Sequence, residues 1–205
     1  MALADRRQQY RESLRQEILD AARELFVRQG YEATSIRRIA EKVGCSPGII
    51  YHYFEDKPAV MAQLVRETFA QMNARVSMMA NDDAPPLDNL RRALRAYIEF
   101  GIQNPHHYSI LFRKQELFGN SPQIAEAYRN DGLKTFDCMR AVVKRAMDSG
   151  VLRPELTDTE EIAQALWASI HGMISIQIGA KGFPFIEQSR LIDRLVDILI
   201  TGIKQ

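Results

Sequence analysis

The chain has 205 residues, with 46% hydrophobic and 26% charged residues, which are ordinary values for one large or two small globular domains. Its formal net charge of +1 does not indicate a nucleic acid or a membrane partner, so such a partner must be recognised by a local patch. The two cysteines, Cys45 and Cys138, argue against a disulfide framework and fit a reducing cytosol. Since no apolar run suits a signal peptide or a membrane span, we expect a cytoplasmic protein with no membrane partner.

Helical periodicity dominates the first eighty residues, and strand-like alternation is almost absent. The stretch "RESLRQEILDAARELFVRQGY" repeats apolar residues at spacings of three and four until Gly30, which is placed as a helix C-cap. A second, short helix is predicted to begin at Thr34 or Ser35 and to break at Gly44. The segment "SPGIIYHYF" forms a third helix, and a fourth begins around "DKPAV" and runs toward Met79.

The composition changes at "NDDAPPLDN", where prolines and aspartates predict a linker. Helical patterns then resume over residues 87–104, 105–118, 122–149, 158–180 and 187–203. No glycine-rich phosphate loop, internal repeat or low-complexity tract is present. The sequence therefore predicts an all-α protein of about nine helices, with an N-terminal three-helix unit and a larger C-terminal helical domain.

Residues 35–54 have the pattern of a helix-turn-helix, with residues 44–46 as its turn. At about 100° per residue, Ile50 and Phe54 share an apolar face of the third helix, and the opposite face carries polar tips. A solvated outer face would explain this pattern as well. The residue types nevertheless favour DNA, because a start with serine, proline and glycine exposes backbone N–H groups and lets the backbone approach a phosphate closely.

The stretch "GYEATSIRRIAEKVGCSPGIIYHYFEDKPAVMAQLV" resembles the DNA-binding domain of TetR-type (TetR/AcrR) transcriptional regulators in one gap-free register. The matching features are Gly30-Tyr31, Thr34, Ile39-Ala40, Gly44, Ser46, Gly48, Tyr51, Phe54 and Lys57. The resemblance implies a homodimer that places two recognition helices in successive major grooves of a double-stranded DNA operator. It also implies a repressor that is released by a small-molecule effector.

The resemblance and the residue chemistry together give a predicted helix-turn-helix domain over residues 12–72, followed by a sensing and dimerisation domain over 80–205. The residues expected to bind DNA are Thr34, Ser35, Arg37, Arg38, Ser46, Pro47, Gly48, Tyr51, His52, Tyr53 and Lys57.

Two positions depart from the family pattern. Pro47 and Ile49 stand where many relatives place polar side chains that read bases, so direct hydrogen-bond readout is expected to be thin. This keeps open an alternative, a helical ligand-binding or adaptor protein whose helix-turn-helix no longer binds DNA specifically. The leading segment "DRRQQYRESLR" also has two interpretations, a solvated helix start or a basic arm that touches DNA.

The C-terminal half resembles the TetR subgroup with a Trp-x-x-x-His-Gly motif, here Trp167, His171 and Gly172. Trp167 and His171 are one helical turn apart and share a face. An aromatic cluster with a few polar groups is typical of a ligand cavity, although plain core packing explains the same residues. The residues expected to bind an effector are Phe100, Tyr108, Phe112, Phe118, Phe136, Trp167 and His171.

The final predicted helix, 187–203, has apolar residues on more than one face, which favours a homodimer over a single wide buried face. The family resemblance implies that the last two helices pack against their symmetry mates in a four-helix interface. Adjacent His106 and His107 with distant Cys138 do not have the spacing of a metal site. No GxSxG, HExxH or paired-carboxylate motif is present, so we expect neither an enzyme nor a cofactor.

Overall fold

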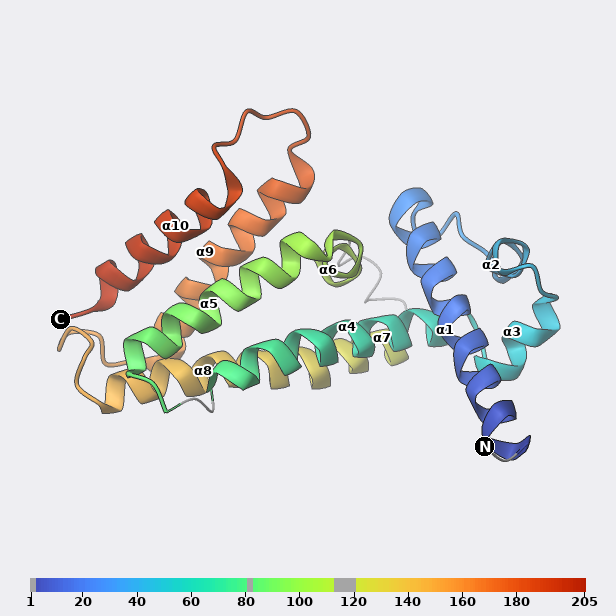
Figure 1. The fold of residues 1–205 in the computed structure, drawn as a ribbon, viewed down its shortest axis with the longest axis horizontal. Coiled ribbons are helices and arrows are strands. Elements are labelled where there is room, and N and C mark those ends of the chain that lie inside the picture. Colours follow the sequence, from blue (N-terminus) through green and yellow to red (C-terminus); the bar gives the residue numbers. More distant parts are fainter. Residues whose placement is uncertain (1–2, 81–82, 113–120) are drawn as a thin grey trace. The chain divides into compact units, whose positions relative to one another are not determined.

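The computed structural model describes residues 3–80, 83–112 and 121–205, and helices joined by loops make up this part of the chain (Figure 1). The helices are α1 (Leu3–Gln29), α2 (Ile36–Val43), α3 (Pro47–Tyr53), α4 (Lys57–Ala80), α5 (Pro86–Gln103), α6 (Pro105–Phe112), α7 (Pro122–Ala127), the π-helical turn η2 (Tyr128–Gly132), α8 (Leu133–Asp148), α9 (Thr159–Gly179) and α10 (Gln188–Ile203).

The predicted all-α fold of about nine helices is confirmed, since α7, η2 and α8 follow one another without a break and count as one helix. Extended pairing in the described residues is limited to an isolated bridge between Leu152 and Lys204. The end of the predicted helix 105–118 lies outside the described residues, because α6 is described only to Phe112.

The chain divides into two compact units, each with its own core. Unit 1 consists of Met1–Thr68 and His106–Asn130, and unit 2 consists of Phe69–Pro105 and Asp131–Gln205. The division falls inside α4 and inside η2 rather than in the proline-rich linker. Residues 106–130, which follow that linker in the sequence, are thus grouped with the helix-turn-helix.

Unit 1 is built on one face of α1. Ile18, Leu19, Ala22 and Phe26 are buried, as the spacing of three and four predicts. The helix stops at Gly30, whose φ of 89° is in the left-handed region that glycine adopts without strain. The helix α2 packs against both α1 and α3.

The turn between α2 and α3 depends on Gly44. Its φ is 78°, and its N–H donates to the carbonyl oxygens of Ala40 and Glu41, so it closes α2 and redirects the chain. The buried side chains of Ile50 and Phe54 then anchor α3 and the residue that follows it. At the start of α4, the Asp56 carboxylate accepts from the Ala59 N–H at 2.7 Å, so Asp56 caps this helix.

Unit 2 is organised around α5, which packs against α8, α9 and α10. Its buried face includes Leu90, Leu94 and Ile98. Next to this face, Arg91 and Arg95 form ion pairs with Asp197 and Asp193 of α10. No described helix is long and apolar enough to span a bilayer.

Replacing Ile50 with Ala tests how strongly α3 depends on burial. Because Ile50 is fully buried, we expect the free energy of unfolding of unit 1 to fall by about 2–5 kcal/mol. Ile49→Ala is the matched control, since Ile49 is 38% exposed and its loss should cost only about 0.5 kcal/mol. Urea unfolding followed by circular dichroism measures both, and equal losses would show that α3 is not held by its inner face.

Candidate nucleic-acid interface

The outer face of α3 exposes polar groups on a short, anchored helix. Burial of Ile50 turns Gly48, Tyr51 and His52 toward solvent, and the Tyr51 side chain is 57% exposed. Tyr53 is half-buried, and its ring lies edge-on to that of His52. Hydroxyl and imidazole groups on rigid rings can donate hydrogen bonds to phosphate oxygens. The face is therefore suited to docking on a polyanion.

The start of α3 differs in one detail from what the sequence indicates. Pro47 occupies the first helical turn, and Ser46 takes the N-cap position, but the Ser46 hydroxyl makes no capping hydrogen bond. The Ile49 N–H donates to the Ser46 carbonyl oxygen at 3.0 Å. The exposed Ser46 hydroxyl is consequently left to contact another molecule.

The start of α2 separates two residues that the sequence treats alike. The Ser35 side chain is exposed and accepts from the Arg38 N–H at 3.3 Å. Thr34 is buried, and its hydroxyl donates to the Gly30 carbonyl oxygen at 2.8 Å. The Thr34 side chain therefore holds the loop before α2 and does not face solvent.

The two arginines of α2 also have different surroundings. Arg38 donates from Nη1 to the Gln29 side chain at 2.6 Å and to the Ala33 carbonyl oxygen at 3.3 Å. Arg37 is exposed and has no ion pair or hydrogen-bonded partner in the described part of the chain. Arg37 is thus free to meet a phosphate, whereas Arg38 already fastens α2 to the end of α1.

Lys57, at the first position of α4, is held by an aromatic residue. Its ammonium donates to the Tyr31 carbonyl oxygen at 2.9 Å and lies 4.1 Å from the centre of the Tyr31 ring. Burial, with Glu32 and Asp56 nearby, raises the pKa of the Tyr31 phenol to about 12, so the ring stays neutral. An ammonium has three N–H donors, so donors remain for an external anion.

A buried charged cluster, which no sequence motif indicated, lies behind this surface in unit 1. Arg23 of α1 is only 6% exposed and pairs with Asp20 and with Glu67 of α4, the latter at 3.6 Å. Arg15 reaches the same Glu67 carboxylate at 3.4 Å. The cluster fastens α1 to α4, and spacing alone would have found only that Arg15 and Arg23 are two turns apart.

His107 of α6 borders this cluster. Burial is the main cause that lowers the pKa of its imidazole from 6.5 to about 4, and Arg23 and His106 lower it further while Asp20 opposes them. The imidazole is therefore neutral at physiological pH. The protonation state of His107 on α6 therefore depends on the charges of Arg23 and Asp20 on α1.

The residues predicted to bind an effector fall into three groups. Tyr108 and Phe112 belong to unit 1, where their ring centroids are 4.6 Å apart, and Phe118 lies outside the described residues. The other four residues belong to unit 2: Phe100, Phe136, Trp167 and His171.

Trp167 is the centre of the unit 2 group. Its indole N–H donates to the Tyr97 hydroxyl at 2.9 Å, and its ring lies 6.1 Å from Phe136 and 5.9 Å from His171. Burial lowers the pKa of His171, and Ser175 lies 3.2 Å from its Nε2. Phe100 is buried in the core of unit 2. Aromatic rings with a polar tip thus gather on α8 and α9.

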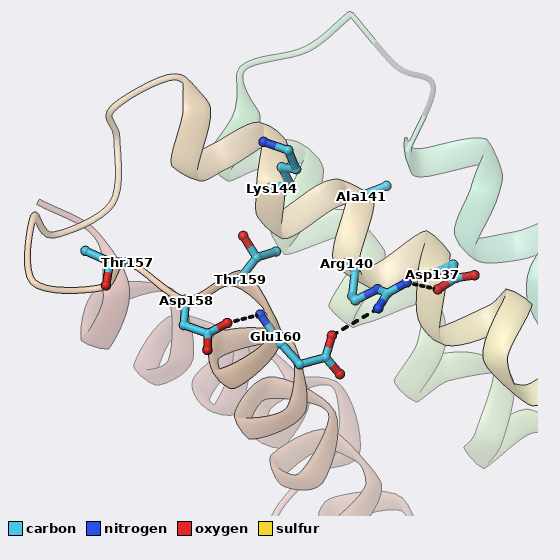
Figure 2. Close-up of a pocket in the computed structure, with 8 residues that line it drawn as sticks. All are labelled: Asp137, Arg140, Ala141, Lys144, Thr157, Asp158, Thr159 and Glu160. Atoms are coloured by element: carbon cyan, nitrogen blue, oxygen red, sulfur yellow. Dashed lines mark hydrogen bonds and ion pairs between the residues drawn. The ribbon is translucent and has the colours of Figure 1, made fainter.

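Unit 2 also has a groove whose lining residues are not part of this aromatic group. It has a volume of about 730 Å³ and runs between α8 and the start of α9, and Figure 2 shows that its walls are mainly polar. Arg140 lies between the carboxylates of Asp137 and Glu160, and Lys144 pairs with Asp148 outside the groove. None of the predicted effector residues lines this groove. Its cations are already paired, so it is not a built anion site.

Cys45 lies in the turn before α3 and is half-buried. Burial raises the pKa of its thiol, so the thiolate needed for redox chemistry is disfavoured. The described residues contain no group of three or more histidine, cysteine or acidic side chains placed to hold a metal ion.

The sequence matches two family models that together cover more than half of the chain. Residues 18–64 match the model described as bacterial regulatory proteins of the tetR family, and residues 90–201 match the Tetracyclin repressor-like C-terminal domain. The chain belongs to the TetR family. It is thus a DNA-binding transcriptional regulator rather than an enzyme, although membership of the Trp-x-x-x-His-Gly subgroup is not shown.

Individual relatives agree with this assignment. The chain is 27% identical over 158 residues to the transcriptional regulator AcrR of Shigella flexneri, which covers 75% of this chain and 74% of the relative. It is 29% identical over 145 residues to the transcriptional repressor AcnR of Corynebacterium efficiens, covering 69% and 70%. The fold is similar to that of the regulator FadR from Bacillus subtilis, solved in complex with stearoyl-CoA, with a TM-score of 0.77 at 19% identity over 92% of this chain and 98% of the other.

The low pKa of His107 predicts a pH-dependent stability. The unfolded chain takes up the proton at a higher pH than the folded one, so stability should be lost as the pH falls from about 6.5 toward 4. His107→Gln should flatten the stability curve in this window, and exposed His106→Gln is the control. Urea midpoints at several pH values measure this, and identical slopes for the wild type and His107→Gln would contradict it.

Proposed function

We propose that the protein is a homodimeric repressor that binds a pseudo-palindromic DNA operator and is released from it by a small apolar ligand. The observation that carries the proposal is the anchored α3, which buries Ile50 and presents Gly48, Tyr51 and His52. A helix of this kind in each protomer would enter the major groove of one half-site.

The proposed contacts with the phosphate backbone surround α3. These contacts come from the exposed Ser35 at the N-cap of α2, Arg37 of α2, the Ser46 hydroxyl and the Lys57 ammonium, together with Tyr51, His52 and Tyr53. The Thr34 hydroxyl and the Arg38 guanidinium are better explained as internal supports, since their hydrogen bonds close the loop between α1 and α2. Such a set would position the protein on the duplex without specifying its sequence.

Sequence preference would then depend on few groups. Half-buried Pro47 and exposed Ile49 offer no hydrogen-bonding side chain at the start of α3. An isoleucine can contact a thymine methyl group, and phosphate contacts can report groove width and bending. We therefore propose that shape readout contributes more to specificity than hydrogen bonds to base edges.

The homodimer is supported by apolar residues that α9, α10 and the segment between them leave exposed. Ile176, Phe183, Ile186 and Ile198 are each more than half exposed. The buried face of α10 is formed instead by Ile192, Val196 and Ile200. An apolar surface on both sides of α10 suits a helix that has a partner outside its own unit.

Binding to the protein's own upstream DNA tests the proposal. Fluorescence anisotropy at physiological salt should show a clear preference for a duplex from that region over a scrambled duplex of the same composition. If the protein has no such preference, the repressor function fails, and a helical adaptor that no longer binds DNA specifically becomes the better explanation.

Substitutions of the neighbouring Arg37 and Arg38 provide a matched test of the proposed contacts with DNA phosphates. Arg37→Ala should weaken binding on all sequences and reduce the slope of log K against log salt by about 0.9, the value for one lost phosphate contact. Arg38→Ala should keep the wild-type slope but lower the melting temperature, because it releases Gln29 and Ala33. If Arg37→Ala keeps the wild-type slope of log K against log salt, Arg37 does not contact a phosphate.

The sensor can be followed through Trp167, the one tryptophan of the chain. A panel of compounds with an apolar chain, beginning with a saturated acyl-CoA, should contain a ligand that changes the Trp167 emission, raises the melting temperature and weakens DNA binding. Phe136→Ala should weaken that ligand's binding, whereas exposed Phe183→Ala should not. A ligand that stabilises the protein without changing its DNA affinity would contradict release by ligand.

A further inference from the structure

The first turns of α1 continue beyond the core of unit 1 (Figure 1). The helix begins at Leu3, and its inward face carries buried Ile18, half-buried Leu14, and then exposed Arg11 and Arg7 at spacings of three and four. The same face that packs on the helix-turn-helix thus changes from apolar to basic where the core ends. The leading segment is therefore helical from Leu3 onward rather than an extended arm.

Arg11 brings this face next to the outer surface of α3. Its Nη2 lies 3.0 Å from Nε2 of His52. A guanidinium can only donate, so Nε2 of His52 must be the acceptor and the proton of the neutral ring must lie on Nδ1. Arg11 therefore sets the tautomer of His52. The remaining Nδ1–H can donate a hydrogen bond to an external oxygen atom.

The charge on this face is not compensated within the described chain. Arg7 and Arg11 are separated by about 40° around the helix, whereas Asp5 and Glu12 lie about 100° or more from Arg11. Glu12 is engaged by the Gln8 amide, and neither Arg7 nor Arg11 forms an ion pair with a described residue. The four-residue helical rise separates the Cα atoms of Arg7 and Arg11 by about 6 Å along the axis, close to two base-pair steps of DNA.

We propose that Arg7 and Arg11 extend the DNA-binding surface onto α1 and bind backbone phosphates next to the base pairs that α3 covers. Arg11 has a second role as a positioning residue, because it orients His52 and fixes its donor. This inference rests on the proposed DNA-binding function. It adds a flanking contact from outside the helix-turn-helix, and its partner is double-stranded DNA of any sequence.

The experiment uses the full chain and two duplexes from its upstream region. One duplex is trimmed to the two half-sites that the α3 helices are proposed to enter, and the other is extended by several base pairs on both flanks. The wild type should bind the extended duplex with a salt slope that is steeper by about 0.9 for each added phosphate contact. Arg7→Gln and Arg11→Gln should lose this gain, whereas Arg6→Gln, about 100° from Arg7 around the helix, should keep it.

Two results would overturn the inference while the proposed function stands. One is specific wild-type binding that Arg7→Gln and Arg11→Gln leave unchanged on the extended duplex, and the other is an equal loss in Arg6→Gln. If the wild type itself does not distinguish its upstream DNA from a scrambled duplex, both proposals fail together. Each variant should keep the melting temperature of the wild type, because all three arginine side chains are exposed. A measured melting temperature therefore separates lost DNA contacts from lost stability.

The positioning role has its own spectroscopic test. Nitrogen NMR of the His52 ring should show the Nδ1-protonated tautomer in the wild type and a shift toward the Nε2-protonated form in Arg11→Gln. Arg11→Lys keeps the charge and a donor, so it should preserve both the tautomer and the salt slope. An Nε2-protonated ring in the wild type would exclude the assigned role.

Discussion

The burial of Ile50 and Phe54 is the constraint on which the functional surface depends. A helix as short as the seven residues of α3 does not persist in water unless packing supports it. By fixing the inner face, these two side chains decide that Gly48, Tyr51 and His52 point outward. Poor helix formers at the start of α3 are tolerated for the same reason, because Pro47 lies in the first turn.

Polar contacts hold the helices around α3 together, and they also determine which basic side chains have partners inside the protein. Thr34, Arg38 and the Lys57–Tyr31 pair fasten the loop between α1 and α2, and the Arg23 cluster fastens α1 to α4. These contacts engage some basic groups and leave others free. Among the basic groups of unit 1 that keep free donors, Arg37, Arg7 and Arg11 lie on exposed parts of α1 and α2. A nearly neutral protein can thereby carry a local basic surface.

Periodicity was sufficient to predict the helices, because each buries one stripe of apolar residues, and the glycines at 30 and 44 marked two of their ends. Local pattern could not reveal which polar side chains have partners inside the protein. Thr34 and Arg38 look like phosphate ligands in the sequence, but their partners lie across a loop or on another helix. The contacts of Arg11 with His52 and of Arg23 with Glu67 link residues more than forty positions apart, so no spacing rule indicates them.

Hydroxyl-radical footprinting of the protein, with and without its upstream DNA, tests the central claim most directly. The outer face of α3 should become protected, so the oxidation of Tyr51, which is 57% exposed, should fall when DNA is bound. Met78 of α4, which is 70% exposed and outside the proposed surface, should be oxidised at an unchanged rate and serves as the internal reference. If Tyr51 stays as reactive in the complex as in the free protein, α3 does not dock on DNA and the account is wrong.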